Sequence, residues 1–280
     1  MIGIVDVGGG TRGVYGAGVF DYLIDRGIRL PYCIGVSAGS ANAITYMAGQ
    51  RGRTYRFYTE YVFRREYMGA GLFFRTGSYI NLDYIYAVLS NEGGEYPLDF
   101  DAFAGSGGEL RVVATDADSG ETVYFTGGDV RRNDYRILCA SSCVPVVCRP
   151  YVISGRRYYD GGISDPIPVR QALRDGCDRL IVILTRPRGQ LRTNRRDRRL
   201  AGLIRRSFPA AAERLARRAE AYNAELEELR VLERKGDALI VAPDGTEGMK
   251  TLTRDPVRLN EMYEKGYRDA QAIPEFIRSA

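Results

Sequence analysis

The hydrophobic pattern of the first 48 residues predicts two buried strands, each followed by a turn and a helix. Ile2–Val7 and Tyr32–Val36 are short apolar runs of the kind that form buried strands. Residues 15–26 carry apolar side chains at helical spacing and stop before Gly27, and residues 41–48 also favour a helix. Two strands joined by a helix form a right-handed parallel unit, so the chain opens as an α/β protein.

The remainder of the chain adds further strands and then becomes mainly helical. Strands are expected at residues 110–115, 121–126, 151–154, 157–159 and 179–184. From about residue 186 the pattern changes. A helix is expected over residues 210–235, a short strand over residues 238–242, and another helix from Asp255-Pro256, with proline at its first position.

The composition narrows the chemistry, because the 280-residue chain contains no histidine. A Ser-His-Asp triad, a Cys-His dyad and a histidine zinc site are therefore excluded within this chain. Any proton transfer must use a carboxylate, Tyr, Cys, Lys, Arg or water. No metal site is expected, since Cys139, Cys143 and Cys148 include no Cys-x-x-Cys pair.

The same composition indicates a cytoplasmic protein. Five cysteines are an odd number, and the first residues show no basic or cleavage-like features of a signal peptide, so we expect reduced thiols. No apolar run reaches the length of a membrane span. A peripheral association with a membrane surface is compatible with this pattern.

Basic residues are concentrated in one segment. Of the 40 Lys and Arg residues only three are lysines, and the densest group of arginines follows residue 185. This arginine cluster consists of Arg186, Arg188, Arg192, Arg195, Arg196, Arg198, Arg199, Arg205 and Arg206. Such a cluster can bind phosphates of lipid headgroups or of nucleic acid, whereas a solvated, partly mobile segment is the more ordinary interpretation.

A Gly-x-Ser-x-Gly motif, Gly35-Val36-Ser37-Ala38-Gly39, lies between a predicted strand and a predicted helix. In this context the motif forms a nucleophile elbow, because the tight turn exposes the serine hydroxyl and brings neighbouring backbones close to it. Ser37 is therefore a candidate nucleophile. A packing turn made of small residues is the alternative.

The glycine-rich run Gly8–Gly13 follows the first predicted strand and can direct several backbone N–H groups at a negative charge. A dinucleotide fingerprint would require an acidic residue at the end of the second strand, which instead ends at Val36 before Ser37. A Walker loop would require Lys after Gly13, where the chain has Val14. An oxyanion hole beside the serine explains both turns, since neighbouring parallel strands end at the same sheet edge.

Without histidine, a serine nucleophile needs another base, and a partly buried carboxylate can serve. Asp160 is the best candidate, because it ends a predicted strand and precedes Gly161-Gly162, where other backbone can approach closely. The lysines are weaker candidates, because all three lie in the C-terminal part of the chain.

The three motifs, in this order, resemble the signatures of the patatin-like phospholipases, which use a Ser-Asp dyad. The resemblance implies a three-layer α/β/α fold with a mainly parallel sheet over residues 1–185, and a largely helical C-terminal extension over residues 186–280 that packs on it. It also implies a nucleophilic Ser37, a basic Asp160 and no cofactor. The backbone of Gly9, Gly10, Thr11 and Arg12 would form the oxyanion hole. The remaining glycines of the three motifs are Gly8, Gly13, Gly35, Gly39, Gly161 and Gly162.

Other segments resemble a bacterial cytosolic subgroup of the family that has such an extension. They are Asn81–Tyr84, Pro97–Asp99, Ala114–Asp116, Ala140–Ser142, Asp165–Pro168 and Tyr263–Tyr267. One departure concerns the residue before the triple glycine, which is Asp or Glu in many members. Here that position is Val7, and Asp6 lies one residue earlier.

The resulting hypothesis is a serine acyl hydrolase that cleaves carboxylic esters of lipids through an acyl-enzyme. Residues 51–74 and Phe100–Phe103 are candidate walls for an acyl chain, with ordinary core packing as the alternative. Transient contact with an anionic membrane and homo-oligomers are compatible with it, and no nucleic-acid partner is expected. The competing hypothesis is a non-catalytic protein that binds phosphate or nucleotide through Gly8–Gly13 or the arginine cluster.

Overall fold

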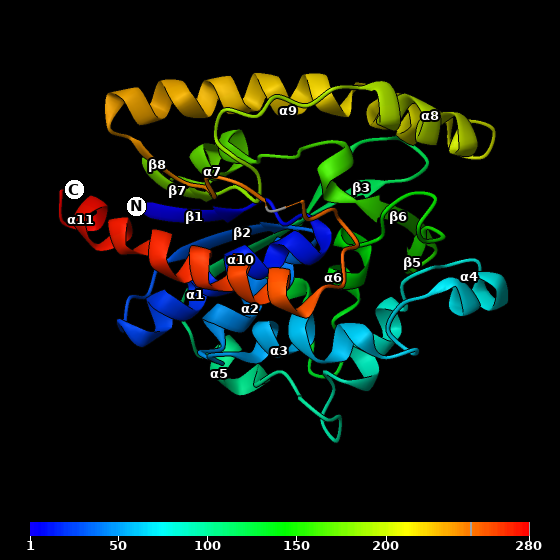
Figure 1. Cartoon of the computed structure of the whole chain (residues 1–280), viewed down its shortest axis with the longest axis horizontal. Helices are drawn as coiled ribbons and strands as arrows, with labels where there is room; N and C mark the ends of the chain where they lie inside the picture. The colour runs from blue at the N-terminus through cyan, green and yellow to red at the C-terminus, as the bar shows by residue number, and fades with distance from the viewer. Residues whose placement is uncertain (247, 280) are drawn as a thin grey trace.

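A mainly parallel sheet runs through the centre of the molecule in the computed structural model, which describes residues 1–246 and 248–279 (Figure 1). Among these residues it has eight strands in the order β5-β6-β3-β2-β1-β7-β8, with β4 paired to β3. The strands are β1 (Ile2–Asp6), β2 (Tyr32–Val36), β3 (Glu109–Asp116), β4 (Thr122–Thr126), β5 (Tyr151–Ile153), β6 (Arg156–Asp160), β7 (Arg179–Ile183) and β8 (Ala238–Val241). Along the series β3-β2-β1-β7-β8, every neighbouring pair of strands is parallel. The pairs β3-β4, β3-β6 and β5-β6 are antiparallel.

Helices cover both faces of this sheet, as a parallel sheet requires. The helices are α1 (Val14–Asp25), α2 (Ala38–Met47), α3 (Arg53–Thr59), α4 (Ala70–Thr76), α5 (Phe100–Ala104), α6 (Arg136–Ser141), α7 (Val169–Arg174), α8 (Arg195–Ile204), α9 (Pro209–Lys235), α10 (Pro256–Asp269) and α11 (Ile273–Arg278). Helices α7 and α9 lie on one face, and α1, α2 and α10 lie on the other (Figure 1). The predicted three-layer α/β/α fold is confirmed.

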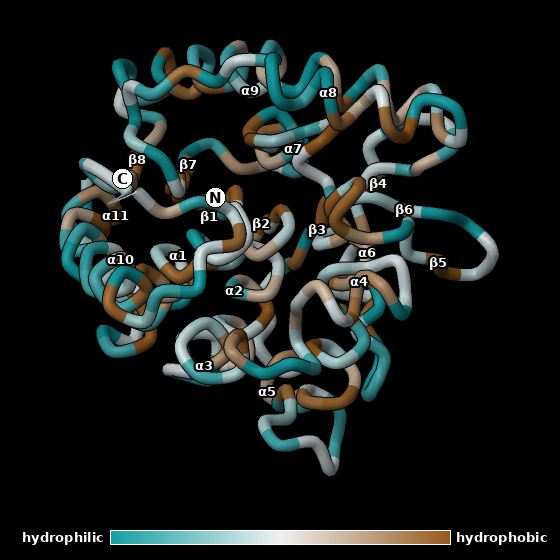
Figure 2. The backbone as a smooth tube through the Cα atoms, turned by 45° about the vertical axis from the view of Figure 1, so that its right-hand side comes forward, coloured by the Kyte–Doolittle hydropathy of each residue, from teal (hydrophilic) through white to brown (hydrophobic). Residues whose placement is uncertain are grey.

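Apolar side chains from the sheet and the helices fill the space between the layers. On the α9 face, Leu226 and Leu229 belong to the same buried cluster as Val5, Ile34 and Val182 of the central strands. Figure 2 shows hydrophobic positions at β2 and β3 inside the molecule and mainly hydrophilic positions along α10 at its edge. None of the described helices has both the length and the apolar character needed to cross a membrane.

The segment after residue 185 contributes to the same layers. Strand β8 extends the central sheet beside β7, and α10 packs against α1. The backbones of α1 and α10 touch, because a Cβ atom on Gly18 would lie 2.1 Å from the Tyr263 carbonyl oxygen. The Tyr263 hydroxyl donates a buried hydrogen bond to Asp21. The C-terminal part of the chain is therefore packed into the same sheet and helix layers as the N-terminal part.

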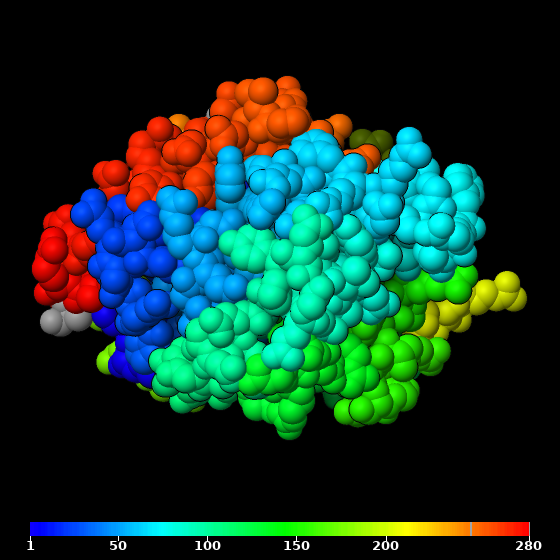
Figure 3. All heavy atoms as spheres, turned by 90° about the horizontal axis from the view of Figure 1, so that it is seen from below, coloured from blue at the N-terminus to red at the C-terminus, as the bar shows by residue number. Residues whose placement is uncertain are grey.

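The region between α2 and β3 forms one side of the molecule. Figure 3 shows this region, from light blue through cyan to blue-green, spread over much of the face in view. Within it, α3 is followed by α4 and by a π-helical turn, Tyr84–Val88. This region carries most of the aromatic side chains around Ser37.

Candidate active site

Ser37 lies in the turn between β2 and α2, with backbone angles φ 57° and ψ −127°. A non-glycine residue with positive φ is strained, and the strain is tolerated where surrounding contacts hold the turn. Here the Ser37 amide donates to the Ser141 hydroxyl (2.8 Å), and the Ser40 hydroxyl donates to the Ser37 carbonyl (2.6 Å). The Ser141 hydroxyl in turn donates to the Val113 carbonyl on β3 (2.6 Å). These contacts give the turn the geometry of a nucleophile elbow.

The glycine after Ser37 allows two backbones to meet. A Cβ atom on Gly39 would lie 2.2 Å from the Asp6 carbonyl oxygen at the end of β1. The first turn of α2 therefore packs directly on the strand that leads into the glycine-rich run. This contact explains why the serine turn and the glycine turn lie beside each other.

Asp160 ends β6 and is buried, and it lines the same cavity as Ser37. Its carboxylate accepts a hydrogen bond from the Gly162 amide (2.8 Å), and its own amide donates to the Cys143 carbonyl (2.8 Å). Burial raises the pKa of Asp160 above its ordinary value of 3.8, although the nearby Ser37 side chain and the hydrogen bond from the Gly162 amide oppose this shift. Ser37 and Asp160, 123 positions apart in the sequence, thus lie in one cavity.

Three consecutive glycines shape the loop next to Ser37. Gly8, Gly9 and Gly10 all have positive φ angles, of 61°, 133° and 62°. Successive turns of this kind direct backbone amides into a concave anion site. The amides of Gly9 and Gly10 are well placed to receive an oxyanion, because Gly9 caps the 3-10 helix Gly10–Gly13 and Gly10 begins it, so neither amide has a partner within that helix.

One amide of the predicted oxyanion hole is already engaged. The Thr11 amide donates to the Thr251 carbonyl (2.9 Å), and the Thr11 hydroxyl lies 3.3 Å from the same oxygen. The Thr11 amide is therefore less available to an oxyanion than the amides of Gly9 and Gly10, whereas the predicted role of all four residues, Arg12 included, stays a prediction. The contact joins residues 240 positions apart, and no local pattern around either residue predicts it.

The residue directly before the triple glycine is Val7 and not the Asp or Glu of many family members, and here a carboxylate is supplied by Asp6, one residue earlier. The Asp6 side chain is fully buried and accepts hydrogen bonds from the Gly8 amide (2.9 Å) and from the Asn42 side chain (2.8 Å). Burial raises the pKa of Asp6 to about 6, and both hydrogen bonds oppose the shift. The Asn42 side chain also donates to the Gly13 carbonyl. Asp6 therefore anchors both ends of the glycine loop to α2 from one residue before Val7.

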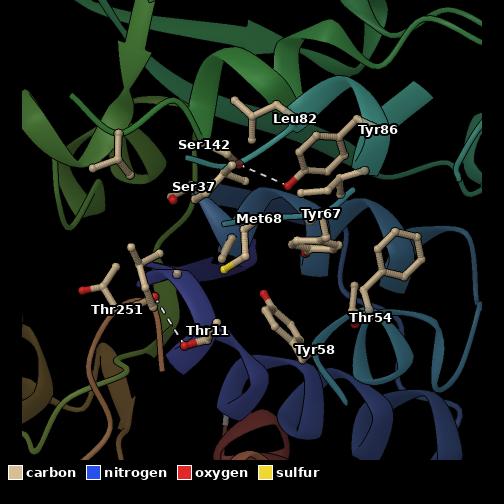
Figure 4. Close-up of a pocket in the computed structure, with 18 of the residues that line it drawn as sticks. Thr11, Ser37, Thr54, Tyr58, Tyr67, Met68, Leu82, Tyr86, Ser142 and Thr251 are labelled. Carbon is tan, nitrogen blue, oxygen red and sulfur yellow. Dashed lines mark hydrogen bonds between the residues drawn. The ribbon is translucent and has the colours of Figure 1, made fainter. Parts of the chain in front are cut away.

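Ser37 opens onto a narrow, mainly apolar cavity. Its wall includes Phe57, Tyr58, Tyr67, Met68, Leu82 and Tyr86, several of which point into the space beside Ser37 (Figure 4). Residues 51–74 therefore contribute to the wall, as expected. The expectation for Phe100–Phe103 is wrong: Phe103 is buried in the core beneath α5, and neither phenylalanine lines the cavity.

A second cavity, of about 470 Å³, meets the first at Ser37 and also contains Asp160. Three members of the arginine cluster, Arg186, Arg192 and Arg196, line it. Arg186 and Arg192 are half-buried, so the interpretation of the whole cluster as a solvated segment is wrong for these two, whereas Arg196 is exposed. The remaining members, Arg188, Arg195, Arg198, Arg199, Arg205 and Arg206, are exposed.

No group of side chains suited to a metal ion occurs among the described residues. All five cysteines are buried and none forms a disulfide. The groups that line the space at Ser37 include its own hydroxyl, the buried Asp160 carboxylate and the backbone of the glycine-rich loop.

Comparison with known proteins now identifies the family. The model of the patatin-like phospholipase family matches residues 7–173, which include all three motifs. The chain belongs to the patatin-like phospholipase family. Membership indicates a lipid esterase or hydrolase in general terms and does not favour the nucleotide-binding alternative. A second family model, of a domain of unknown function (DUF6363), matches residues 208–279.

Individual relatives extend the comparison. Over 192 residues the chain is 34% identical to the uncharacterized protein YjjU of Escherichia coli (strain K12), which covers 66% of this chain. The match covers 52% of YjjU, so the chain spans about half the length of this relative. The crystal structure of VipD from Legionella pneumophila is similar with a TM-score of 0.51 at 15% identity, over 99% of this chain and 66% of VipD. At that identity the likeness concerns the fold alone.

Proposed function

We propose that this patatin-like protein is a serine acyl hydrolase that cleaves carboxylic esters of lipids with Ser37 as nucleophile and Asp160 as base. One observation carries the proposal: a serine in a strained elbow shares a cavity with a buried aspartate. A carboxylate with a raised pKa is a stronger base than a solvated one, which suits it to this task in a chain without histidine.

The reaction would proceed in two halves. Asp160 accepts the Ser37 proton as the serine oxygen attacks the acyl carbonyl carbon, and the amides of Gly9 and Gly10 stabilise the resulting oxyanion. Asp160 then gives this proton to the departing alcohol oxygen, which leaves an acyl ester on Ser37. In the second half Asp160 deprotonates a water molecule that attacks the acyl ester, and the proton returns to Ser37 as the fatty acid departs.

The two cavities fit the two sides of an ester. The apolar wall formed by Tyr58, Tyr67 and Met68 suits a hydrocarbon chain, because burying it removes apolar surface from water. The second cavity contains Asp160, which must reach the alcohol oxygen as it leaves. We therefore place the acyl chain in the first cavity and the alcohol part in the second.

The pH dependence of hydrolysis tests this proposal. Asp160 must be deprotonated to act as a base, and burial raises its pKa above 3.8, so kcat/KM should fall on acidification with an apparent pKa above that value. The measurement is p-nitrophenyl butyrate hydrolysis from about pH 4 to about pH 9, with circular dichroism to confirm folding at each pH. A rate that rises on acidification, or that is flat over this range, would contradict Asp160 as the base.

A further inference from the structure

The cavity on the alcohol side of Ser37 is unusually cationic. Its charged lining residues are Arg12, Arg186, Arg192, Arg196 and Arg218, with Asp160 and Asp197. Four of the five arginines lie outside the residues matched by the phospholipase family model, and Arg218 lies in the matched domain of unknown function. Arg12 alone comes from the glycine-rich loop.

The arginines in this cavity have too few protein partners. Arg12 is only 7% exposed, and its guanidinium forms no hydrogen bond or ion pair with the described residues; its buried Nε atom has no partner. Arg186 likewise has no ion pair within the described part of the chain. A buried guanidinium without an acceptor is costly, which indicates that an acceptor comes from outside the protein.

Two other arginines of this cavity, Arg192 and Arg218, share one carboxylate. Asp197 is buried and accepts a hydrogen bond from the Arg218 Nε atom (3.1 Å), and the Arg192 guanidinium lies 3.6 Å from the same oxygen. Burial and, secondarily, the neighbouring arginines lower the pKa of Arg12 to about 10. The two carboxylates of this cavity, Asp160 and Asp197, thus leave the positive charge of its five arginines largely uncompensated.

The position of these arginines relative to Ser37 indicates which part of an ester substrate would carry the anion. The cationic and apolar cavities share Gly10, Ser37, Val144, Thr251 and Leu252, so they meet at the serine. An ester carbonyl at Ser37 with its acyl chain in the apolar cavity therefore places the alcohol part among the arginines. A ligand that bridges both cavities must carry an anion a short distance from its ester bond.

We propose that this cavity is a headgroup subsite, which takes the phosphate of a phospholipid whose headgroup carries negative charge and no positive charge. The inference rests on the proposed function and adds a substrate class to it. Guanidinium groups bind phosphate oxygens in pairs of parallel hydrogen bonds, so several arginines together suit a phosphate. The same charges repel the ammonium of a choline or ethanolamine headgroup.

The test compares substrates that differ only in the headgroup. Soluble dihexanoyl phosphatidic acid, dihexanoyl phosphatidylcholine and dihexanoylglycerol are supplied as monomers, so membrane surface charge plays no part. For the unaltered protein we expect kcat/KM to be at least about tenfold higher for phosphatidic acid than for phosphatidylcholine. Dihexanoylglycerol, without phosphate, should resemble the poorer substrate.

Variants assign the preference to the cavity. Arg186→Gln should reduce the preference for phosphatidic acid over dihexanoylglycerol by about 10-fold to 100-fold, the usual cost of losing a charged hydrogen bond. Arg199→Gln is the matched control, because Arg199 belongs to the same cluster but is exposed and outside the cavity. It should leave both the preference and p-nitrophenyl butyrate hydrolysis unchanged. An unchanged preference in Arg186→Gln, or equal rates for the three lipids, would overturn the proposal.

A binding measurement separates a headgroup from a free anion and does not depend on turnover. Calorimetric titration of Ser37→Ala with dihexanoyl phosphatidic acid should show binding that Arg186→Gln weakens about tenfold or more. Binding of inorganic phosphate but not of the lipid would assign the cavity to a free anion and refute the headgroup subsite. If the unaltered protein hydrolyses no ester at all, the proposed function fails, while this titration still decides whether the cavity binds the lipid phosphate.

Discussion

Replacing Ser37 with alanine is expected to lower kcat/KM for p-nitrophenyl butyrate by at least about 10³-fold. The substitution removes the hydroxyl that lies in the strained elbow and shares a cavity with the Asp160 carboxylate. Substrate binding should change little, because the hydroxyl contributes a small part of the cavity wall. The measurement is steady-state hydrolysis, with urea unfolding to show that the variant folds.

Ser142→Ala is the matched control for this variant. Ser142 lines the same apolar cavity, and its hydroxyl lies 3.2 Å from that of Tyr86 and not beside Asp160. Its removal should lower kcat/KM by no more than about tenfold, the usual value of one hydrogen bond. Equal losses in Ser37→Ala and Ser142→Ala, or retained activity in Ser37→Ala, would remove Ser37 from the mechanism.

Replacing Asp160 with asparagine should lower kcat/KM by about 10³-fold to 10⁴-fold, the range seen when the acidic member of a serine hydrolase triad is neutralised. The amide oxygen of asparagine can still accept the hydrogen bond from Gly162, but the side chain cannot take up a proton. Because burial raises the pKa of Asp160, the fold favours the neutral form of this side chain. Asp160→Asn should therefore fold at least as stably as the unaltered protein at neutral pH.

A second buried aspartate provides the control for this variant. Asp165 lies five residues further along, and burial raises its pKa also, but its carboxylate accepts a hydrogen bond from Tyr124 and lines neither cavity at Ser37. Asp165→Asn should retain activity within about tenfold. Equal losses in the two variants would indicate a structural effect of burying an amide and would contradict the role of Asp160 as the base.

The sheet was largely predictable, because its strands are encoded by local patterns. Each predicted strand, from residues 2–7 to residues 238–242, agrees with the structure to within one residue at either end. Buried parallel strands form continuous apolar runs, and glycine or polar residues end them. The start of α2 was placed three residues too late, because Ala38 continues directly from the strained Ser37 into the helix.

The residues of the candidate site that belong to the three sequence motifs could be selected from the sequence. Ser37 and Asp160 could be chosen because each follows a strand and precedes a residue that permits close approach. The contacts that tune the site were not predictable, because they join distant segments: the Ser37 amide to Ser141, and Thr11 to Thr251. Nothing in the local sequence of either partner marks these pairs.

The arginine cluster shows the same limit. Its density is visible in the sequence, but its division between a cavity and the surface depends on how the segment before α8 folds back over the glycine loop. Arg186 and Arg192 enter the cavity, whereas Arg199 on α8 faces solvent. Phe100–Phe103 illustrates the reverse error, since an aromatic pair in the sequence proved to be ordinary core.

Labelling with a fluorophosphonate probe, followed by mass-spectrometric mapping of the adduct, tests the pairing of Ser37 with Asp160 most directly. The probe reacts with serines whose hydroxyl is activated by a neighbouring base. We predict a single adduct, on Ser37, whose rate of formation falls by at least about 10²-fold in Asp160→Asn and is nearly unchanged in Asp165→Asn. An adduct on another residue, or labelling of Ser37 at the same rate without the Asp160 carboxylate, would contradict the account.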